Sequence, residues 1–522
     1  MASAAPLADR IAPRIAGFFL TAVILLYLGF IGIGNWTNDE YDDFSRLAHE
    51  GWRAVWPRLQ WSPRPLSEPL FLAYGWIVNH ARRPLIIPFL GLLWAGFLAA
   101  GLLTWWQSHR ARNREDAQTE SIALELLAGL ALMASFVSSG PITEVFYWPA
   151  GAAAYLPTLA ATLLLFLQIA RGRLAARSGR LLCSLCLFVA ASSSEAGATF
   201  VLSYALVQVL RLAINAINIR SDKPPDPVLW WLIPSALAVL VLVAVQFNRF
   251  HAVERPVSQL SPALGHPLLS LTTSLRELLL ESLGVQRGSQ AGHSVRGRLL
   301  SQMLLATGLA VCWSRFGRFS RTIARQTATL SVAFVLASLL TIAAAELHFG
   351  ALCCTRHETL RRCWMLMALA GLAIMIVVSV AEKRLRPRSV LTLASALLCA
   401  GVIVPWHAKA VLREYRIYGA IYYAMDQNFR SGFDPDHSQM TFLLLPPGGL
   451  IYQEQVTPGV YTRGPQSPMY VQFVLGFFDK ESMVVHSADE WMDHRERRPA
   501  VNPLVSVIRI ALSNPQGHSS CN

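Results

Sequence analysis

Long apolar segments separated by polar connections run through most of this chain. Eleven of these segments are almost free of charged residues, and an apolar stretch of about 20 residues is long enough to cross a bilayer as an α-helix. The pattern therefore predicts an α-helical polytopic membrane protein with about eleven transmembrane helices. The predicted spans are residues 15–34, 85–105, 122–138, 151–170, 181–192, 198–214, 229–247, 299–313, 327–345, 365–381 and 390–406.

The overall composition indicates the same class. Hydrophobic residues make up 53% of the 522 residues and charged residues only 15%, which excludes an ordinary water-soluble globular protein. The fifth predicted span is short, and the small-residue turn at residues 193–197 joins it to the sixth. These two spans therefore favour a helical hairpin.

The charge of the chain is strongly basic and unevenly placed. A net charge of +13 would suit nucleic-acid binding, but the basic residues gather in alternate short connections, as in the cytoplasmic loops of membrane proteins. This distribution predicts a cytoplasmic N-terminus, an extracytoplasmic C-terminus and no nucleic-acid partner. The basic connections contain Arg110, Arg112 and Arg114; Arg171, Arg173, Arg177 and Arg180; Arg220 and Lys223; Arg315, Arg318, Arg321 and Arg325; and Lys383, Arg384, Arg386 and Arg388.

The chain divides into two predicted domains. Residues 1–406 form the transmembrane domain, with its longest outer connections at residues 35–84 and 248–298. Residues 407–522 follow the last apolar span and are less apolar. A segment of that length can form a small domain of its own, which we expect outside the membrane.

Within the second domain the pattern changes from long apolar segments to short ones. We predict a helix over about residues 407–428, and strands at residues 441–445 and 471–475, so that the domain is α/β. Residues 434–437 contain two aspartates and a histidine. They indicate a turn rather than a metal site, because their spacing fits no calcium loop.

The first outer connection begins with an acidic cluster directly after the first span. Asp39, Glu40, Asp42 and Asp43 lie within five consecutive residues, and acids so close to the membrane edge are costly without a partner. They either attract a cation or act as a general base on a substrate held among the lipid headgroups. Further along the connection, Arg64 is suited to a phosphate, since a guanidinium group pairs with it bidentately.

Two further motifs place acids at the outer ends of predicted helices. Glu144 precedes the fourth span, together with an aromatic group of Tyr147, Trp148 and Tyr155. A carboxylate at a helix start is favoured by the helix dipole, which is its simpler interpretation. Glu195 stands between the fifth and sixth spans with no basic residue near it in sequence, so it is either a functional acid or the cap of the sixth helix.

Basic residues before the tenth span can complete an anion-binding site. Arg356 and His357 belong to this connection, and an arginine placed against a departing phosphate stabilises its negative charge. Arg361 and Arg362 follow them, with anchoring at the membrane interface as the alternative role. The residues identify no cofactor, and a requirement for a divalent metal ion stays open.

Three of these motifs together resemble a known group of proteins. They are the acids of the D-E-Y-D-D-F segment after the first span, the E-x-x-Y-W-x-x-G-x-x-x-Y segment before the fourth, and the small-residue turn that ends in Glu195. The group consists of bacterial multi-span proteins akin to the O-antigen glucosyltransferases and similar to the GT-C superfamily of membrane glycosyltransferases. The resemblance covers about the first two hundred residues, and beyond them only the span pattern agrees.

The resemblance implies a GT-C-like fold in the bacterial inner membrane. It implies an enzyme that takes a sugar from a polyprenyl-phosphate donor at the outer face, with a glycan or lipid-linked acceptor and membrane lipids as the other partners. Asp39 would be the general base, Glu40 the second catalytic acid and Arg64 a phosphate contact. The remaining substrate-binding candidates are Asp42, Asp43, Glu144, Tyr147, Trp148, Tyr155, Glu195, Arg356 and His357.

The acidic cluster departs from the pattern of the group in two ways. Glu40 stands in place of an aspartate, and Asp42 and Asp43 are additional. Which of the four acids is the base therefore stays open.

Two other functions also stay open. A transporter or flippase of lipid-linked glycans would show internal repeats or spans broken by Gly and Pro, and it would carry ionisable residues within its spans. Here the acids gather instead at the outer ends of predicted helices. An O-antigen ligase or polymerase uses the same class of lipid-linked substrate.

Overall fold

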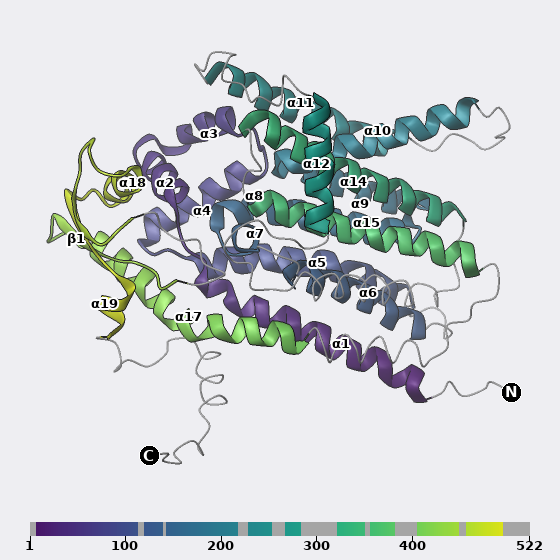
Figure 1. Ribbon diagram of the computed structural model, residues 1–522, viewed down its shortest axis with the longest axis horizontal. Coiled ribbons are helices and arrows are strands. Elements are labelled where there is room, and N and C mark those ends of the chain that lie inside the picture. Colours follow the sequence, from purple (N-terminus) through teal and green to yellow (C-terminus); the bar gives the residue numbers. More distant parts are fainter. Residues whose placement is uncertain are drawn as a thin grey trace.

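The computed structural model describes residues 7–112, 119–138, 142–217, 228–252, 267–282, 321–349, 355–381, 404–447 and 456–493. Most of these residues belong to helices, which run side by side in one elongated bundle (Figure 1). A small sheet lies at one end of the bundle, beyond the end of α1. We call this end the sheet end and the other the opposite end.

The helices and strands of the described residues fall into two halves of the chain. The first half contains α1 (Leu7–Leu28), η1 (Gly29–Ile33), α2 (Asn38–Glu50), η2 (Gly51–Ala54), α3 (Val55–Trp61), α4 (Ser67–Ala81), α5 (Ile86–Arg112), α6 (Thr119–Ser138), α7 (Thr143–Phe146), α8 (Pro149–Ala170), η3 (Arg173–Ala175), α9 (Arg177–Ser193) and α10 (Glu195–Ile217). The second half contains α11 (Leu229–Ala252), α12 (Pro267–Ser282), α14 (Arg321–Phe349), α15 (Thr355–Ala381), α17 (Val404–Gly432), β1 (Gln439–Leu443), β2 (Gly459–Thr462), α18 (Met469–Phe478), β3 (Ser482–His486) and α19 (Ala488–Asp493).

Among the described residues, six helical segments are long and apolar enough to cross a membrane. They confirm the predicted class of an α-helical membrane protein, and each coincides with a span expected from the sequence to within a few residues. The segments are Arg14–Ile33, Ile86–Gln107, Pro149–Ala170, Glu195–Ile214, Leu229–Phe247 and Thr322–Ala345.

The other five predicted spans have different outcomes. Residues 122–138, 181–192 and 365–381 lie in α6, α9 and α15, which pack alongside the six segments. Residues 299–313 lie outside the described part of the chain, as do residues 390–406 apart from the last three positions. The total of eleven therefore stays a prediction.

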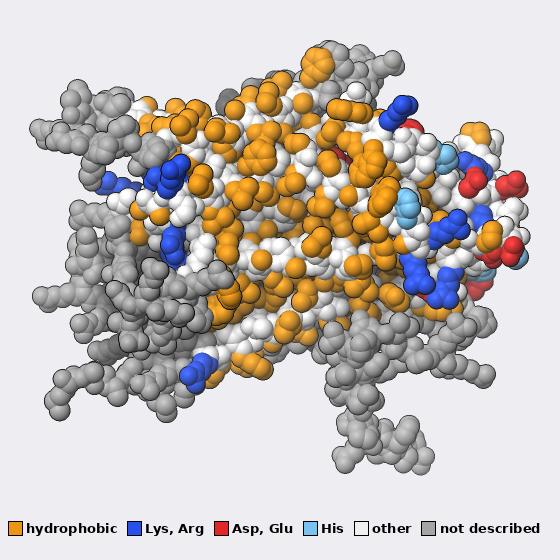
Figure 2. Space-filling model, turned by 180° about the vertical axis from the view of Figure 1, so that it is seen from behind, with side chains coloured by type: hydrophobic (Ala, Val, Ile, Leu, Met, Phe, Trp, Pro, Cys, Tyr) orange, Lys and Arg blue, Asp and Glu red, His pale blue; other side chains and the backbone are white. Residues whose placement is uncertain are grey.

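The surface of the bundle is apolar along its middle. Figure 2 shows hydrophobic side chains over the central part of one face, with charged side chains gathered toward the two ends. On α11, for example, Ile233, Leu240 and Phe247 are each at least 60% exposed. Apolar patches of this extent are rare on water-soluble proteins, whereas lipid tails would cover them in a membrane.

Helix α8 occupies the centre of the bundle. Of its most apolar stretch, 89% is buried, compared with 33% for α11, and it contacts α5, α9, α14 and α15. Its first turn is made of small residues, and a side chain on Gly151 would meet the Glu144 carbonyl oxygen at 2.0 Å. Small residues here therefore allow α7 to pack directly on the start of α8.

Helices α9 and α10 form the predicted hairpin. Only Ser194 separates them, and its hydroxyl accepts a hydrogen bond from the Gly197 backbone nitrogen at 3.0 Å, as an N-cap residue does. A side chain on Gly197 would lie 2.0 Å from the Ala190 carbonyl oxygen. Glycine is therefore required for the close approach of the two helices.

At the sheet end, the described part of the second domain is an α/β unit. Strand β3 lies between the other two strands, parallel to β1 and antiparallel to β2. Met440 is aligned with Met483 in the first pair, and Tyr461 with Met483 in the second. Helix α17 precedes β1, as predicted, but extends beyond the expected limits at both ends.

The predicted strand at residues 471–475 is wrong, because this segment belongs to α18. Its buried residues are Tyr470, Val471, Val474, Leu475 and Phe478, a spacing that fits one face of a helix. A short apolar run does not distinguish a strand from a buried helix by its periodicity. The strands β2 and β3 were not predicted.

The α/β unit packs against the first outer connection. The Trp36 ring lies 5.3 Å from that of Phe477 and 4.8 Å from that of Phe429. The Tyr41 ring lies 5.9 Å from that of Tyr470. These aromatic contacts join Trp36, just before α2, to α17 and α18, and Tyr41 of α2 to α18. The start of the acidic cluster is therefore held between the bundle and the α/β unit.

Residues 434–437 form a turn, as predicted. The Asp434 carboxylate accepts a hydrogen bond from the Asp436 backbone nitrogen at 3.0 Å, which is an Asx turn.

Candidate functional site

The acidic cluster forms the first turns of α2, and its members have different surroundings. Glu40 is fully buried and accepts hydrogen bonds from the Thr37 backbone nitrogen at 2.8 Å and from the Trp148 indole at 3.1 Å. It also accepts one from the Ala150 backbone nitrogen, in the first turn of α8, at 3.0 Å. This carboxylate therefore joins the N-terminal ends of α2 and α8, where the dipoles of both helices favour an anion.

Burial, followed by the charge of the neighbouring Asp39, raises the pKa of Glu40 to about 7, while the three hydrogen bonds oppose the shift. The contacts of Glu40 are those of a residue that positions two helices. They leave little room for a substrate at its oxygens.

Asp42 and Asp43 are both paired with arginines. Asp42 forms an ion pair with Arg46 at 2.8 Å on the surface of α2. Asp43 is buried and forms one with Arg58 of α3 at 2.9 Å. Burial raises the pKa of Asp43 to about 8, and the Arg58 guanidinium opposes this shift.

Asp39 differs from the other three acids. Its side chain is half-buried, and within the described residues it makes no hydrogen bond or ion pair. It precedes Asp43 by four residues, which places both on one face of α2. Asp39 acts electrostatically on Arg58, so its carboxylate lies near a cation without being bound to it.

A chain of alternating charges leads from Asp43 across the first outer connection. Arg58 also pairs with Glu68 at 2.9 Å, and Glu68 lies 3.5 Å from Arg64. Arg64 then binds Glu195 at the start of α10 with two hydrogen bonds, of 2.8 and 3.1 Å. We call these five residues the charge chain. Their side chains are at most 19% exposed. Because positive and negative groups alternate, each buried charge lies beside an opposite one, without which its burial would be unfavourable.

The backbone also holds this connection against the α9–α10 hairpin. The Leu66 nitrogen donates to the Ser192 carbonyl at 3.0 Å, and the Ser67 hydroxyl donates to the Ser193 carbonyl at 2.7 Å. The Ser62 hydroxyl donates to Glu195 at 3.1 Å. The ion pair of Arg64 is therefore built into a fixed joint between α4 and the hairpin.

Two arginines flank the ring of Tyr155, on α8. The Arg64 guanidinium lies 5.6 Å from the ring centre and that of Arg356 lies 5.8 Å from it, both within cation–π range. The Tyr155 hydroxyl is 3.0 Å from Nε2 of His357. Burial, followed by the charges of Arg356 and Arg361, lowers the pKa of His357 to about 3, so this imidazole is neutral and can exchange a hydrogen bond with the hydroxyl.

Glu144 and Arg356 connect α7 to the start of α15. Glu144 accepts a hydrogen bond from the Arg356 backbone nitrogen at 3.3 Å and forms an ion pair with its guanidinium at 3.8 Å. The same guanidinium lies 5.2 Å from the ring of Trp148. The structure thus brings together Glu144, Trp148, Tyr155 and Arg356.

Tyr147 lies apart from this group. It is buried, and its hydroxyl donates to the Tyr27 carbonyl at 2.8 Å at the end of α1. Its contact is a packing contact between α1 and α7.

Two members of the charge chain were not expected as site residues. They are Arg58 and Glu68. The signal for Glu68 is its position four residues after Arg64, a spacing at which opposite charges can pair. Arg361 and Arg362 are buried on α15 rather than placed at an interface.

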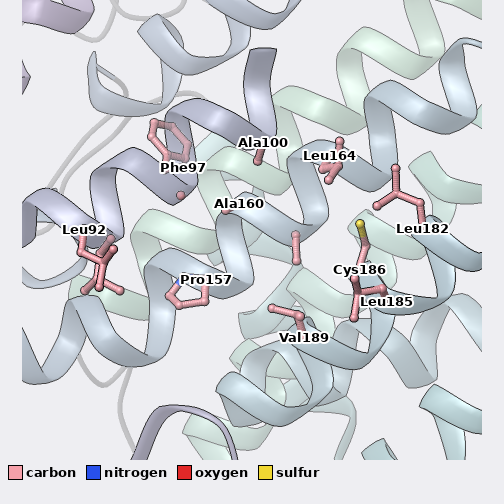
Figure 3. Close-up of a pocket in the computed structure, with 13 residues that line it drawn as sticks. Leu92, Phe97, Ala100, Pro157, Ala160, Leu164, Leu182, Leu185, Cys186 and Val189 are labelled. Carbon is pink, nitrogen blue, oxygen red and sulfur yellow. The ribbon is translucent and has the colours of Figure 1, made fainter. Parts of the chain in front are cut away.

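An apolar groove lies along α8, away from the charged residues of the site. It encloses about 270 Å³ between α5, α8 and α9, and Leu92, Pro157 and Val189 are among the residues that line it (Figure 3). Pro157 follows Tyr155 by two residues on α8. The groove continues toward the opposite end to Leu164 and Leu182, so it runs along the membrane-spanning part of the bundle.

No cluster of three or more His, Cys, Asp or Glu side chains in the described part of the chain is arranged to hold a metal ion. Comparison of the chain with known protein families, curated proteins and solved structures finds no significant match.

Proposed function

We propose that this protein is an integral-membrane glycosyltransferase. It moves a sugar from a polyprenyl-phosphate donor to a glycan or lipid-linked acceptor, at the sheet end of the bundle and on the extracytoplasmic side. The observation that carries the proposal is the state of Asp39. It is the one carboxylate of the described acidic cluster that is neither hydrogen-bonded nor ion-paired, and a general base needs an oxygen free to receive a proton.

The proposed reaction uses Asp39 together with charged residues of the sheet end. The acceptor hydroxyl oxygen attacks the anomeric carbon, the bond between that carbon and the phosphate oxygen breaks, and Asp39 takes the hydroxyl proton. The polyprenyl phosphate leaves with its negative charge. Arg356 stabilises this charge, since its guanidinium group is partly exposed beside Tyr155, whereas Arg64 is already paired with Glu68 and Glu195.

The groove of Figure 3 fits the lipid part of such a donor. It is lined by apolar side chains over the membrane-spanning part of α5, α8 and α9, as an isoprenoid chain requires.

A transporter of lipid-linked glycans is the second candidate, and the charge chain is the observation that favours it. Buried ionisable residues in membrane proteins often mark the pathway of a substrate or an ion. The line from Asp43 through Arg58, Glu68 and Arg64 to Glu195 is continuous, with each step at 3.5 Å or less. Arginine does not release its proton, so a transporter would use the line as a gate whose ion pairs break and re-form, and it would leave the glycosidic bond intact.

The test measures bond cleavage directly. The purified protein in lipid vesicles receives a panel of undecaprenyl-phosphate hexoses and a crude lipid-linked glycan acceptor, and mass spectrometry measures the undecaprenyl phosphate released. The Asp39→Asn variant should lower the rate by about 10²–10⁴-fold, because it keeps the size of the side chain and removes the base. Asp42→Asn is the matched control, since Asp42 is paired on the surface, and it should keep the rate.

Two results would contradict the proposal. If Asp39→Asn releases undecaprenyl phosphate as fast as the wild type, Asp39 is not the base. If the wild type releases none with any donor of the panel but moves intact lipid-linked glycan across the vesicle membrane, transport is the correct function.

A further inference from the structure

A polar pocket, separate from the apolar groove, lies at the opposite end of the bundle, away from the candidate site. It encloses about 410 Å³ between the η3 turn and helices α9, α10, α11 and α14. Its polar and aromatic lining includes Arg180, Gln208, Arg211, Trp230, Trp231 and Gln326. Among the described residues that line it there are two arginines and no carboxylate, a lining that favours an anion.

Arg180 is held in place by the backbone of the η3 turn. Its Nη1 atom donates hydrogen bonds to the carbonyl oxygens of Leu174 and Ala175, at 3.1 and 3.2 Å. Both bonds use the same nitrogen, and a guanidinium group carries five N–H donors. The remaining donors of a positioned arginine are therefore available to an anion in the pocket.

The ends of three helices add to the positive potential. α9 begins at Arg177, α11 at Leu229 and α14 at Arg321, and residues from the first turns of all three line the pocket. The N-terminal end of a helix carries a partial positive charge and unpaired backbone N–H groups, which favour anions. The geometry thus converges on a negative ligand of small size.

The residues around the pocket are typical of the surface of a membrane. Trp230 and Trp231 line it, and tryptophan is typical of the zone between lipid tails and headgroups. On the same turns of α11, Leu229 and Ile233 are 69% and 64% exposed. Acyl chains can lie along these side chains while a headgroup occupies the pocket.

We propose that this pocket binds the phosphate group of an anionic membrane phospholipid. The phosphate is held by Arg180 and Arg211 at the N-terminal ends of the three helices, and the acyl chains lie against α11. Basic pockets between membrane helices bind anionic headgroups in this way. The inference goes beyond the proposed function and does not depend on it, because the pocket and the candidate site lie at opposite ends of the bundle.

The experiment uses the full-length protein purified in dodecyl maltoside. Native mass spectrometry measures how much dioleoyl phosphatidylglycerol or dioleoyl phosphatidylcholine stays bound during titration. The wild type should bind phosphatidylglycerol in preference to phosphatidylcholine. The double variant Arg180→Gln, Arg211→Gln should bind phosphatidylglycerol about 10-fold or more weakly, because charge-assisted hydrogen bonds are lost.

Two further variants provide a second test of the pocket and a control. Gln326→Glu retains both arginines and nearly the same shape but adds a negative charge to the pocket, so it should weaken binding even if the double variant folds poorly. Arg177→Gln removes the same charge from an exposed position that does not line the pocket, and it should bind like the wild type.

Separate titrations with inorganic phosphate and glycerol 3-phosphate distinguish a lipid from a soluble source. If these ions displace phosphatidylglycerol from the wild type and bind as tightly as phosphatidylglycerol does, the phosphate site is supported and its ligand is soluble. The proposal is overturned if the wild type does not distinguish the two lipids. It is also overturned if Gln326→Glu and the double variant bind phosphatidylglycerol as strongly as Arg177→Gln.

Discussion

The two ends of the bundle use arginine in contrasting ways. At the sheet end, Arg58 and Arg64 each lie between carboxylates, and the line from Asp43 to Glu195 alternates in charge. At the opposite end, Arg180 binds backbone carbonyls and no side chain among the described residues, and the described lining of its pocket contains no acid. The first arrangement locks elements together, whereas the second keeps a positive charge available to a ligand.

The acids of the cluster also differ in whether they have a partner from another element. Glu40 and Asp43 are held by partners from other elements, namely α8 and α3. Asp39, which directly precedes Glu40 on α2, has no such partner within the described residues. Structural acids and a candidate catalytic acid therefore stand side by side in sequence, and three predictions separate them.

The largest effect on stability is expected for Glu195→Gln. This variant keeps the shape of the side chain but leaves Arg64 without its closest charged partner, and breaking a buried pair from one side costs about 3 kcal/mol. Denaturant unfolding in detergent measures the loss. The control is Asp426→Asn, which breaks the exposed pair with Arg430 and should cost less than about 1 kcal/mol. Equal losses in the two variants would show that the charge chain does not lock the sheet end.

A smaller loss is expected for Glu40→Gln. The new amide group would face a donor where the carboxylate accepts from Thr37, Trp148 and Ala150, so about 1–3 kcal/mol of stability should be lost. Asp39→Asn, one residue earlier, should change stability by less than about 0.5 kcal/mol because no described contact is removed. If Asp39→Asn destabilises the protein as much as Glu40→Gln, Asp39 is a structural acid too.

The smallest effect is a dependence of stability on pH. The pKa values of Glu40 and Asp43 are raised by burial to about 7 and about 8, from ordinary values of 4.5 and 3.8. The folded protein therefore keeps protons that the unfolded chain has released. This contribution to stability is fully present below about pH 4 and is lost as the pH rises through about 7 to 8.

Melting curves between pH 5.5 and 8.5 test whether stability falls as the pH rises. The melting temperature should fall by a few degrees toward high pH, and Asp43→Asn should make the fall shallower because one of the two groups no longer titrates. Asp42→Asn, on the surface beside Arg46, should keep the wild-type slope. A melting temperature that rises with pH would contradict the predicted direction.

The membrane helices could be predicted because their signal is local. Each of the six segments is an apolar stretch of sufficient length, and the bilayer sets that length. The α9–α10 hairpin followed from the small residues around Ser194. The strand predicted at residues 471–475 is wrong for the opposite reason. A segment this short, with four apolar residues of five, fits a strand or a helix equally well, and the packing of α18 on α2 decided between them.

The candidate site was predicted as a set of residues but not as an arrangement. Asp39, Arg64, Glu144, Tyr155 and Glu195 were singled out by residue type and by position at helix ends. Their pairing joins positions far apart in the chain, as Arg64 does with Glu195. No sequence spacing specifies such a contact, so the partners Arg58 and Glu68 were missed.

The sequence by itself determined the class of this protein, the approximate limits of its described membrane helices and the presence of acids at their ends, because apolar length and residue type are properties of single segments. Only the tertiary structure decided which acid keeps an oxygen free and which arginine keeps its charge uncompensated. Glu40 and Asp39 are neighbours in the chain, yet only Glu40 meets the start of α8. Charge compensation depends on distances of a few ångströms between segments that folding alone brings together.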